Sequence, residues 1–95
     1  VLGALSEALF TYNPDLVWDF DLTGHVRRVN GRVTAMLGYA PDEVVGWHVR
    51  QIVLPDDLPA AEQSFATAAG GQAATCTCRM RHRDGRVVAV RASVI

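Results

Sequence analysis

The segment RMRHRDGRVVAV, residues 79–90, constrains the fold most, because it predicts two strands joined around Asp84-Gly85. An Asp-Gly pair is typical of a two-residue type I′ turn. That turn would place Arg83 opposite Arg86, and each face of the hairpin would then mix arginines with apolar side chains. Such a hairpin has no apolar face to bury, which argues against the two-residue turn.

A three-residue loop, 83–85, shifts this pairing by one residue. One face then becomes apolar and pairs Cys76, Cys78 and Met80 with Ala92, Val90 and Val88. The arginines turn to the outer, solvent side at positions 79, 81, 83 and 91. The sequence therefore predicts a bulged three-residue loop in which Gly85 takes the left-handed conformation.

Alternating apolar residues predict a strand over 16–21, and a weaker second strand follows over 25–29. Short helices are expected next, behind an Asn30 N-cap and over 41–46 and 47–53. A longer helix after 55–57 has an apolar stripe of Leu58, Ala61, Phe65, Ala68 and Ala69, and Gly70-Gly71 end it. The order of elements predicts an α+β domain with an antiparallel sheet and helices over one face.

The last strand, 86–95, needs a neighbour on each side. Strand 74–82 provides one neighbour, and either a further strand or the first strand provides the other. Residues 1–12 form a separate amphipathic helix, with residues 13–95 as the domain proper. The apolar stripe of the helix over residues 1–12 consists of Leu2, Leu5 and Leu9, and we expect this stripe to be a dimer contact.

The length and charge limit what the chain can do. Ninety-five residues make one domain, and a net charge of −1 gives no general attraction to nucleic acid or anionic lipid. No apolar run is long enough to span a membrane. The chain starts at Val1, so we expect it to be a fragment of a longer protein. Cys76 and Cys78 lie two residues apart on one predicted strand, a geometry that is poorly suited to a disulfide bond. The absence of an expected disulfide favours a reducing, cytoplasmic compartment.

Several short motifs together resemble a PAS domain. They are Asp21-x-x-Gly24-x-Val26, Val29-Asn30, Leu37-Gly38-Tyr39, Pro41 with Glu43 and Gly46, Pro55-Asp56-Asp57, and the arginine-rich hairpin ending at Gly85. The resemblance covers nearly the whole chain. It implies a five-stranded antiparallel sheet with short helices over one face, whose last strand is cut off here.

PAS domains are sensory and interaction modules rather than enzymes, and some bind haem, flavin or metabolites. Residues 55–70 contain no His for a haem iron, and His48 is expected to be a surface or helix-end residue. The segment WHVRQIV, residues 47–53, has no Cys for a covalent flavin. Haem and covalent flavin are therefore disfavoured, and the cofactor stays unknown. We find neither a metal site around Cys76, Cys78 and His82 nor a catalytic set.

A ligand would lie between sheet and helices, in a pocket formed by Trp18, Phe20, Met36, Ile52, Phe65, Cys78, Met80, Val88 and Val90. Small side chains at Ala61, Cys78 and Ala92 would leave room for it. The expected function is a non-catalytic, cytoplasmic, homodimeric sensory module of a bacterial signalling protein, with a sensor histidine kinase as the first choice of parent. The alternative is a ligand-free dimerisation or interaction module of a diguanylate cyclase, a phosphodiesterase or a transcription regulator.

Overall fold

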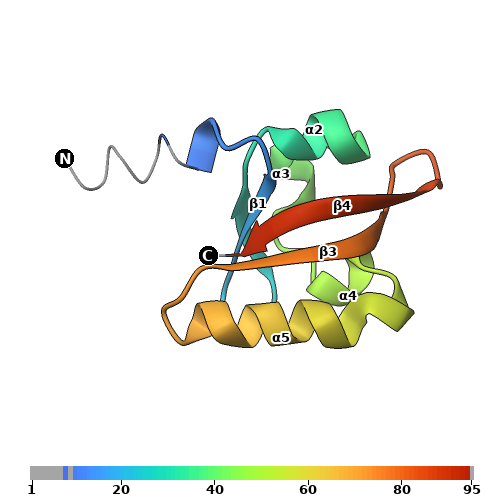
Figure 1. Ribbon diagram of the computed structural model, residues 1–95. Coiled ribbons are helices and arrows are strands. Elements are labelled where there is room, and N and C mark those ends of the chain that lie inside the picture. The colour runs from blue at the N-terminus through green and yellow to red at the C-terminus, as the bar shows by residue number, and fades with distance from the viewer. Residues whose placement is uncertain (1–7, 9, 95) are drawn as a thin grey trace.

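The computed structural model describes residue 8 and residues 10–94 (Figure 1). The elements, in chain order, are β1 Leu16–Phe20, β2 Val26–Val29, α2 Arg32–Leu37, α3 Pro41–Val44, α4 Val49–Ile52, the 3₁₀ helix η1 Pro55–Asp57, α5 Leu58–Ala69, β3 Ala74–Arg81 and β4 Val87–Val94. Every strand and helix expected between residues 16 and 94 is therefore present. None of the described helices is both long enough and apolar enough to cross a bilayer.

Of the helix expected over residues 1–12, the structure describes only residue 8 and residues 10–12, among which Ala8, Phe10 and Thr11 are helical. The expected stripe of Leu2, Leu5 and Leu9 lies outside the described residues. The dimer contact at this stripe therefore stays a prediction.

The four strands form one sheet in the order β2-β1-β4-β3. The expectation of a wholly antiparallel sheet is wrong, because β4 pairs with β1 in parallel, matching Leu16, Val17 and Trp18 with Ala92, Ser93 and Val94. The β1–β2 and β3–β4 pairs are antiparallel. Of the two neighbours considered for the last strand, the first strand is the one observed. This pairing satisfies backbone groups that β1 and β4 would otherwise leave open along one edge each.

The β3–β4 hairpin has the three-residue loop and the register that the sequence predicts. Cys78 pairs with Val90, and Met80 pairs with Val88. His82 N donates to Arg86 O at 2.8 Å and closes the loop. Gly85 has φ of 93°, so it occupies the left-handed region as expected.

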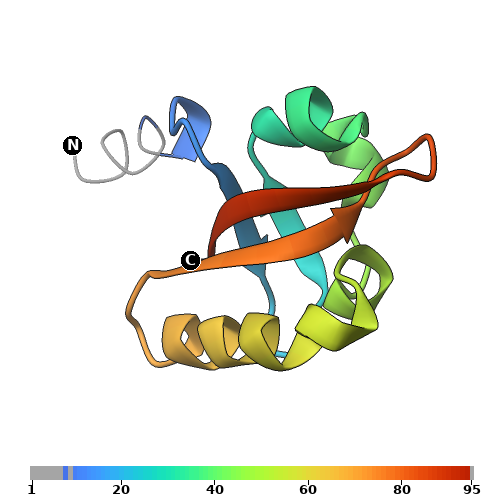
Figure 2. The same cartoon turned by 45° about the vertical axis from the view of Figure 1, so that its right-hand side comes forward.

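One hydrophobic core lies between the inner face of the sheet and helices α2 to α5. In Figures 1 and 2, α5 runs alongside β3 and β4, while α2 and α3 lie toward the other end of the domain. Cys78 and Val90 are both buried in this core, and the arginines at 79, 81, 83 and 91 are exposed. The predicted orientation of the hairpin is confirmed.

Helix α5 follows its predicted stripe except at the C-terminal end. Ala61 is buried, and Leu58, Phe65 and Ala68 are half-buried. Ala69 was expected in the stripe but is exposed, because it lies in the last turn, just before the chain leaves the helix at Gly70.

Strand β1 is buried on both faces, whereas its sequence predicts only one. Val17 is 2% exposed and Asp19 is 8% exposed, although both alternate with the inward-facing residues. The Asp19 carboxylate lies under two guanidinium groups, with Arg27 Nη2 at 2.9 Å and Arg28 Nε at 3.2 Å. The central place of β1 in the sheet explains why side chains cover its outer face.

Asn30 does not cap α2, contrary to expectation. Gly31 occupies the N-cap position, and no side chain there bonds to the helix. The buried Asn30 amide instead accepts from Val17 N at 3.1 Å and donates to Phe10 O and Asp15 O at 3.0 Å. It therefore ties the segment before β1 to the sheet.

Candidate functional site

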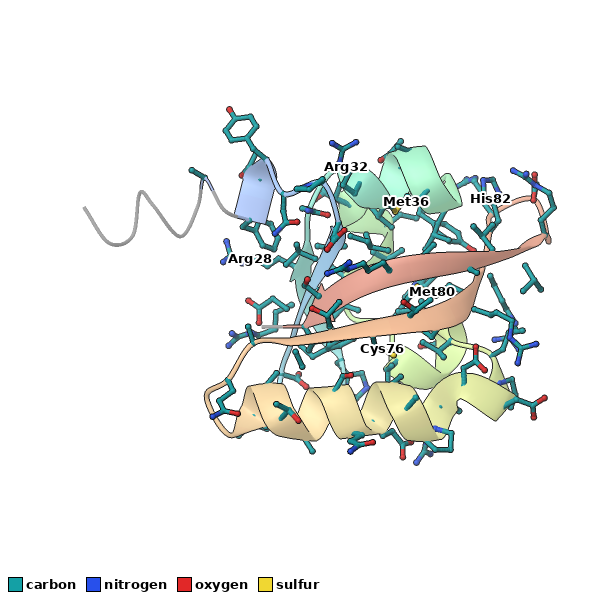
Figure 3. The ribbon with its side chains drawn as sticks, in the orientation of Figure 1. Arg28, Arg32, Met36, Cys76, Met80 and His82 are labelled. Atoms are coloured by element: carbon teal, nitrogen blue, oxygen red, sulfur yellow. The ribbon has the colours of Figure 1, made fainter. Side chains whose placement is uncertain are left out.

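A small internal cavity of about 20 Å³ lies between the sheet and helices α4 and α5. Its lining residues come from β1, β3 and β4 and from the helical segments: Trp18, Phe20, Val49, Ile52, Val53, Ala61, Phe65, Cys76, Cys78, Met80, Ala92 and Val94. In Figure 3, Cys76 lies between β3 and α5. The cavity has room for about one water molecule.

Six of the nine residues predicted to form the pocket line this cavity: Trp18, Phe20, Ile52, Phe65, Cys78 and Met80. Val90 is buried in the core but does not line the cavity. Met36 and Val88 pack against the core from its border and are only partly buried. The structure therefore brings together most of the predicted site and leaves these three residues outside it.

The prediction missed several lining residues, although two of the small ones, Ala61 and Ala92, were expected to leave room. Val49 and Val53 line the cavity from the α4 segment, where the sequence already places them on the same side as Ile52. Val94 lines it too, and the hairpin register extended by two residues beyond Ala92 identifies this position.

Three aromatic rings form one edge of the cavity. Trp18 and Phe20 are stacked with centroids 5.9 Å apart. Phe65 of α5 meets the Phe20 ring edge-on at 6.0 Å. Such contacts fix the relative orientation of the rings, so they join the end of β1 to α5.

The two cysteines contribute thiols to the cavity wall, Cys78 from a buried position and Cys76 from a half-buried one. Burial raises the pKa of Cys78 to about 12, and the neighbouring Cys76 adds to the shift. Both cysteines are free. A thiol with so high a pKa is neither a good nucleophile nor a ready metal ligand at neutral pH. Cys78 is a core residue, as predicted, and Cys76 packs against the core from a half-buried position.

A wider groove of about 730 Å³ lies outside the cavity, between α5 and the ends of β1 and β2. It is lined by Asp19, Phe20, Asp21, Leu22, Arg27, Arg28, Phe65, Ala68, Ala69 and Val94. Two carboxylates and two guanidinium groups line the groove, so its formal charges balance, and its other lining side chains are apolar. Phe20, Phe65 and Val94 line both the groove and the cavity, so they form the wall between the two spaces.

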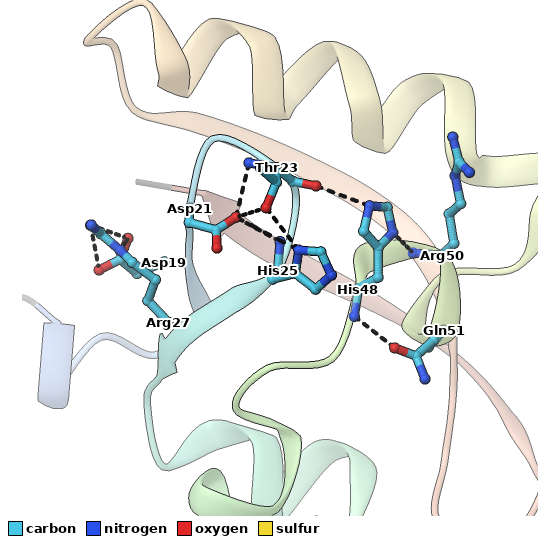
Figure 4. Close-up of polar contacts among 8 residues, drawn as sticks. All are labelled: Asp19, Asp21, Thr23, His25, Arg27, His48, Arg50 and Gln51. Carbon is cyan, nitrogen blue, oxygen red and sulfur yellow. Dashed lines mark hydrogen bonds and ion pairs between the residues drawn. The ribbon is translucent and has the colours of Figure 1, made fainter.

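A polar cluster surrounds the turn between β1 and β2 (Figure 4). The Thr23 hydroxyl donates to Asp21 Oδ1 at 2.6 Å and lies 2.8 Å from His25 Nδ1. Because the single hydroxyl proton goes to the carboxylate, His25 donates to Thr23 and cannot act as its base. The Thr23 hydroxyl and the His25 backbone N–H lower the pKa of Asp21 to about 2. The cluster therefore stabilises the turn between β1 and β2 and does not activate a nucleophile.

His48 is a helix-end residue, as predicted. It is the N-cap of α4, where Nδ1 accepts from Arg50 N at 3.2 Å and Nε2 lies 3.1 Å from Thr23 O (Figure 4). Both ring nitrogens therefore have partners within the chain. Among the residues that the structure describes, no group of three His, Cys, Asp or Glu side chains is placed to hold a metal ion.

Comparisons with known proteins agree with this architecture. The family model for the PAS fold matches residues 26–95. Among solved structures, the crystal structure of a PAS domain from Colwellia psychrerythraea is similar, with a TM-score of 0.69 and 22% sequence identity over 92% of this chain and 75% of that one. No curated protein matches the chain. The family match covers well over half of the chain and includes β2, β3, β4 and helices α2 to α5, though not β1; the chain therefore belongs to the PAS family.

Proposed function

We propose that this PAS domain is the input module of a bacterial signal-transduction protein and that it binds a small apolar molecule in the internal cavity. PAS domains are sensory modules and are typically not catalytic. As the parent we propose a sensor histidine kinase, a choice that rests on the family resemblance. The free thiols of Cys76 and Cys78 support a reducing, cytoplasmic setting.

The position of the cavity is the observation that carries this proposal. Its wall includes Trp18 of β1, Ile52 of α4 and Phe65 of α5, together with residues of β3 and β4. A molecule that enlarged the cavity would therefore push helices and sheet apart at the same time. Binding would favour one arrangement of the helices over another, and this population shift would be passed to an effector domain.

Native mass spectrometry of the chain purified from cells tests ligand binding. We expect an additional bound mass that is lost in an Ala61→Leu variant, because Ala61 is buried and lines the cavity. The matched control is Ala60→Leu, an exposed position on the same helix, which should keep the bound mass. A bound mass that survives both substitutions would place the ligand elsewhere.

A ligand-free assembly module is the second candidate. The small volume of the cavity, about 20 Å³, favours it, since a filled core needs no ligand. Large apolar side chains also lie exposed at Tyr12, Leu22, Val45 and Val87. A purified chain with no bound mass that nevertheless forms a stable homodimer would support this candidate.

The dimer contact that we propose is the stripe of Leu2, Leu5 and Leu9. Sedimentation of Leu5→Asp and Leu9→Asp variants tests it against the unchanged chain. The variants should be monomeric at concentrations where the unchanged chain is dimeric. Dimers of unchanged strength in both variants would rule out this contact.

A further inference from the structure

Trp18 has a buried hydrogen-bond donor that nothing in the described chain satisfies. The residue is 1% exposed, and its indole Nε1 has no acceptor among the described residues. Buried polar groups in folded proteins almost always have a partner, and each exception needs an explanation such as a bound water or ligand. The indole N–H therefore calls for an acceptor from outside the described part of the chain.

The side chains of the other described residues around the cavity offer no strong acceptor, since thiol and thioether sulfurs accept hydrogen bonds only weakly. These side chains are hydrocarbon, aromatic or sulfur-containing, and the Cys78 thiol is neutral because burial raises its pKa to about 12. Among the residues that the structure describes, no charged side chain lines the cavity. An anionic or cationic ligand would lose its hydration there without gaining a counter-charge. The lining is therefore suited to an uncharged molecule that is mostly apolar.

The cavity shares part of its wall with the outer groove. Phe20, Phe65 and Val94 line both spaces. Phe65 is only half-buried and belongs to α5, whose next turn carries Ala68 in the groove. A rotation of the Phe65 side chain away from this shared wall would connect the cavity with the groove of about 730 Å³. The groove lies within the range of roughly 300–1,000 Å³ that is common for ligand pockets.

We propose that Trp18 Nε1 is the hydrogen-bond donor that selects the ligand, and that Phe65 is the gate through which the ligand enters from the groove. The ligand class is an uncharged, largely apolar molecule with one carbonyl or ether oxygen. That oxygen accepts from Trp18, and the apolar body occupies the space opened beside Phe65. This inference rests on the proposed ligand-binding function and adds the chemistry of recognition to it.

Two isosteric probes test the donor directly: acetophenone, which has a carbonyl oxygen, and α-methylstyrene, which has a methylene group in its place. Nuclear magnetic resonance titration of the 15N-labelled chain follows the indole N–H signals. We expect acetophenone to move the Trp18 indole signal downfield and to bind roughly 3- to 10-fold more tightly than α-methylstyrene, as one net hydrogen bond provides.

Two tryptophan variants provide the matched comparison. Trp18→Phe removes the donor and should abolish the preference for the ketone. Trp47→Phe should keep it, because Trp47 packs against Tyr39 with ring centroids 5.1 Å apart and does not line the cavity. Phe65→Ala should speed binding of both probes, and Phe65→Leu is the milder substitute if the alanine variant unfolds.

The outcomes separate this inference from the proposed function. Equal binding of both probes with no movement of the Trp18 signal would overturn the role of Trp18, while an apolar ligand site would remain. An indole N–H held by one water that acetophenone does not displace would overturn it as well. If neither probe bound the unchanged chain or the Phe65 variants, both the gate and the ligand-binding function would be rejected.

Discussion

Asn30 is a buried amide whose hydrogen bonds all go to the backbone. It accepts from Val17 N and donates to Phe10 O and Asp15 O. Removal of the side chain leaves a donor and two acceptors without partners in a site that is 2% exposed. This residue, rather than a cap on α2, determines how the segment before β1 joins the sheet.

We therefore expect Asn30→Ala to lower the free energy of unfolding by about 2–3 kcal/mol, measured by urea denaturation. Asn13→Ala is the control, because the Asn13 side chain accepts one local bond, from Asp15 N to Oδ1 at 2.9 Å. That variant should lose about 1 kcal/mol or less. Equal losses in the two variants would contradict the bridging role of Asn30.

The Asp57–Arg79 pair predicts a dependence of stability on pH. Arg79 donates from Nη2 and Nε and also from its backbone N–H, at 2.9, 3.1 and 2.7 Å. The guanidinium, followed by the backbone N–H, lowers the pKa of Asp57 from 3.8 to about 2. A lowered pKa in the folded state stabilises the fold above the unfolded value, and this contribution disappears as the pH falls through the folded value.

The stability difference between the unchanged chain and Asp57→Asn should thus be largest near neutral pH and should shrink as the pH falls from 3.8 toward 2. Urea denaturation across this range measures it. Asp56→Asn, which removes a neighbouring exposed charge, should show a much smaller pH-dependent difference. A difference for Asp57→Asn that stayed constant down to pH 2 would show that the pKa is not lowered.

At the scale of elements, the β3–β4 hairpin depends on the conformation of Gly85. Its φ of 93° is unfavourable for any residue with a Cβ, although no atom lies within 4 Å of the place where a Cβ would be. The cost of Gly85→Ala is therefore backbone strain alone, about 1–2 kcal/mol in thermal or urea unfolding. Gly31→Ala, also in open space but without a positive φ, should change stability by only about 0.5 kcal/mol.

The register of this hairpin could be predicted because it depends on parity within one segment. A two-residue loop would place Val88 and Val90 on the arginine face, whereas the three-residue loop turns both toward the core and leaves only Val87 opposite an arginine. The helical stripe of α5 could be predicted for the same reason, except at its last turn. Ala69 shows the limit, because helical periodicity cannot tell in which turn the helix ends and loses its contact with the sheet.

At the scale of the whole molecule, the sheet consists of two antiparallel pairs joined by a short parallel pairing. The β1–β4 pairing has three residue pairs, whereas β3–β4 has eight. Native-state hydrogen exchange should therefore show the β1–β4 hydrogen bonds opening at a lower free energy than those of β3–β4. Exchange of both sets at one common free energy would mean that the sheet opens only as a unit.

The candidate site was predictable in outline because its residues lie on inward faces that periodicity identifies. Trp18, Ile52 and Met80 all follow from such patterns, and all three line the cavity. Met36 and Val88 follow from the same patterns but lie at the border of the core. Periodicity gives the face on which a residue lies and not its distance from the centre of the core.

The sequence by itself determined the order of the elements, the loop of the hairpin and the face that each strand buries, because these depend on neighbours a few residues apart. Only the tertiary structure decided that β4 pairs in parallel with β1, that Asn30 binds the segment before β1, and that Phe20 and Phe65 separate a cavity from a groove. These features join residues far apart in the chain. Their partners are chosen by which backbone groups, polar atoms and apolar surfaces remain unsatisfied once the local elements have formed.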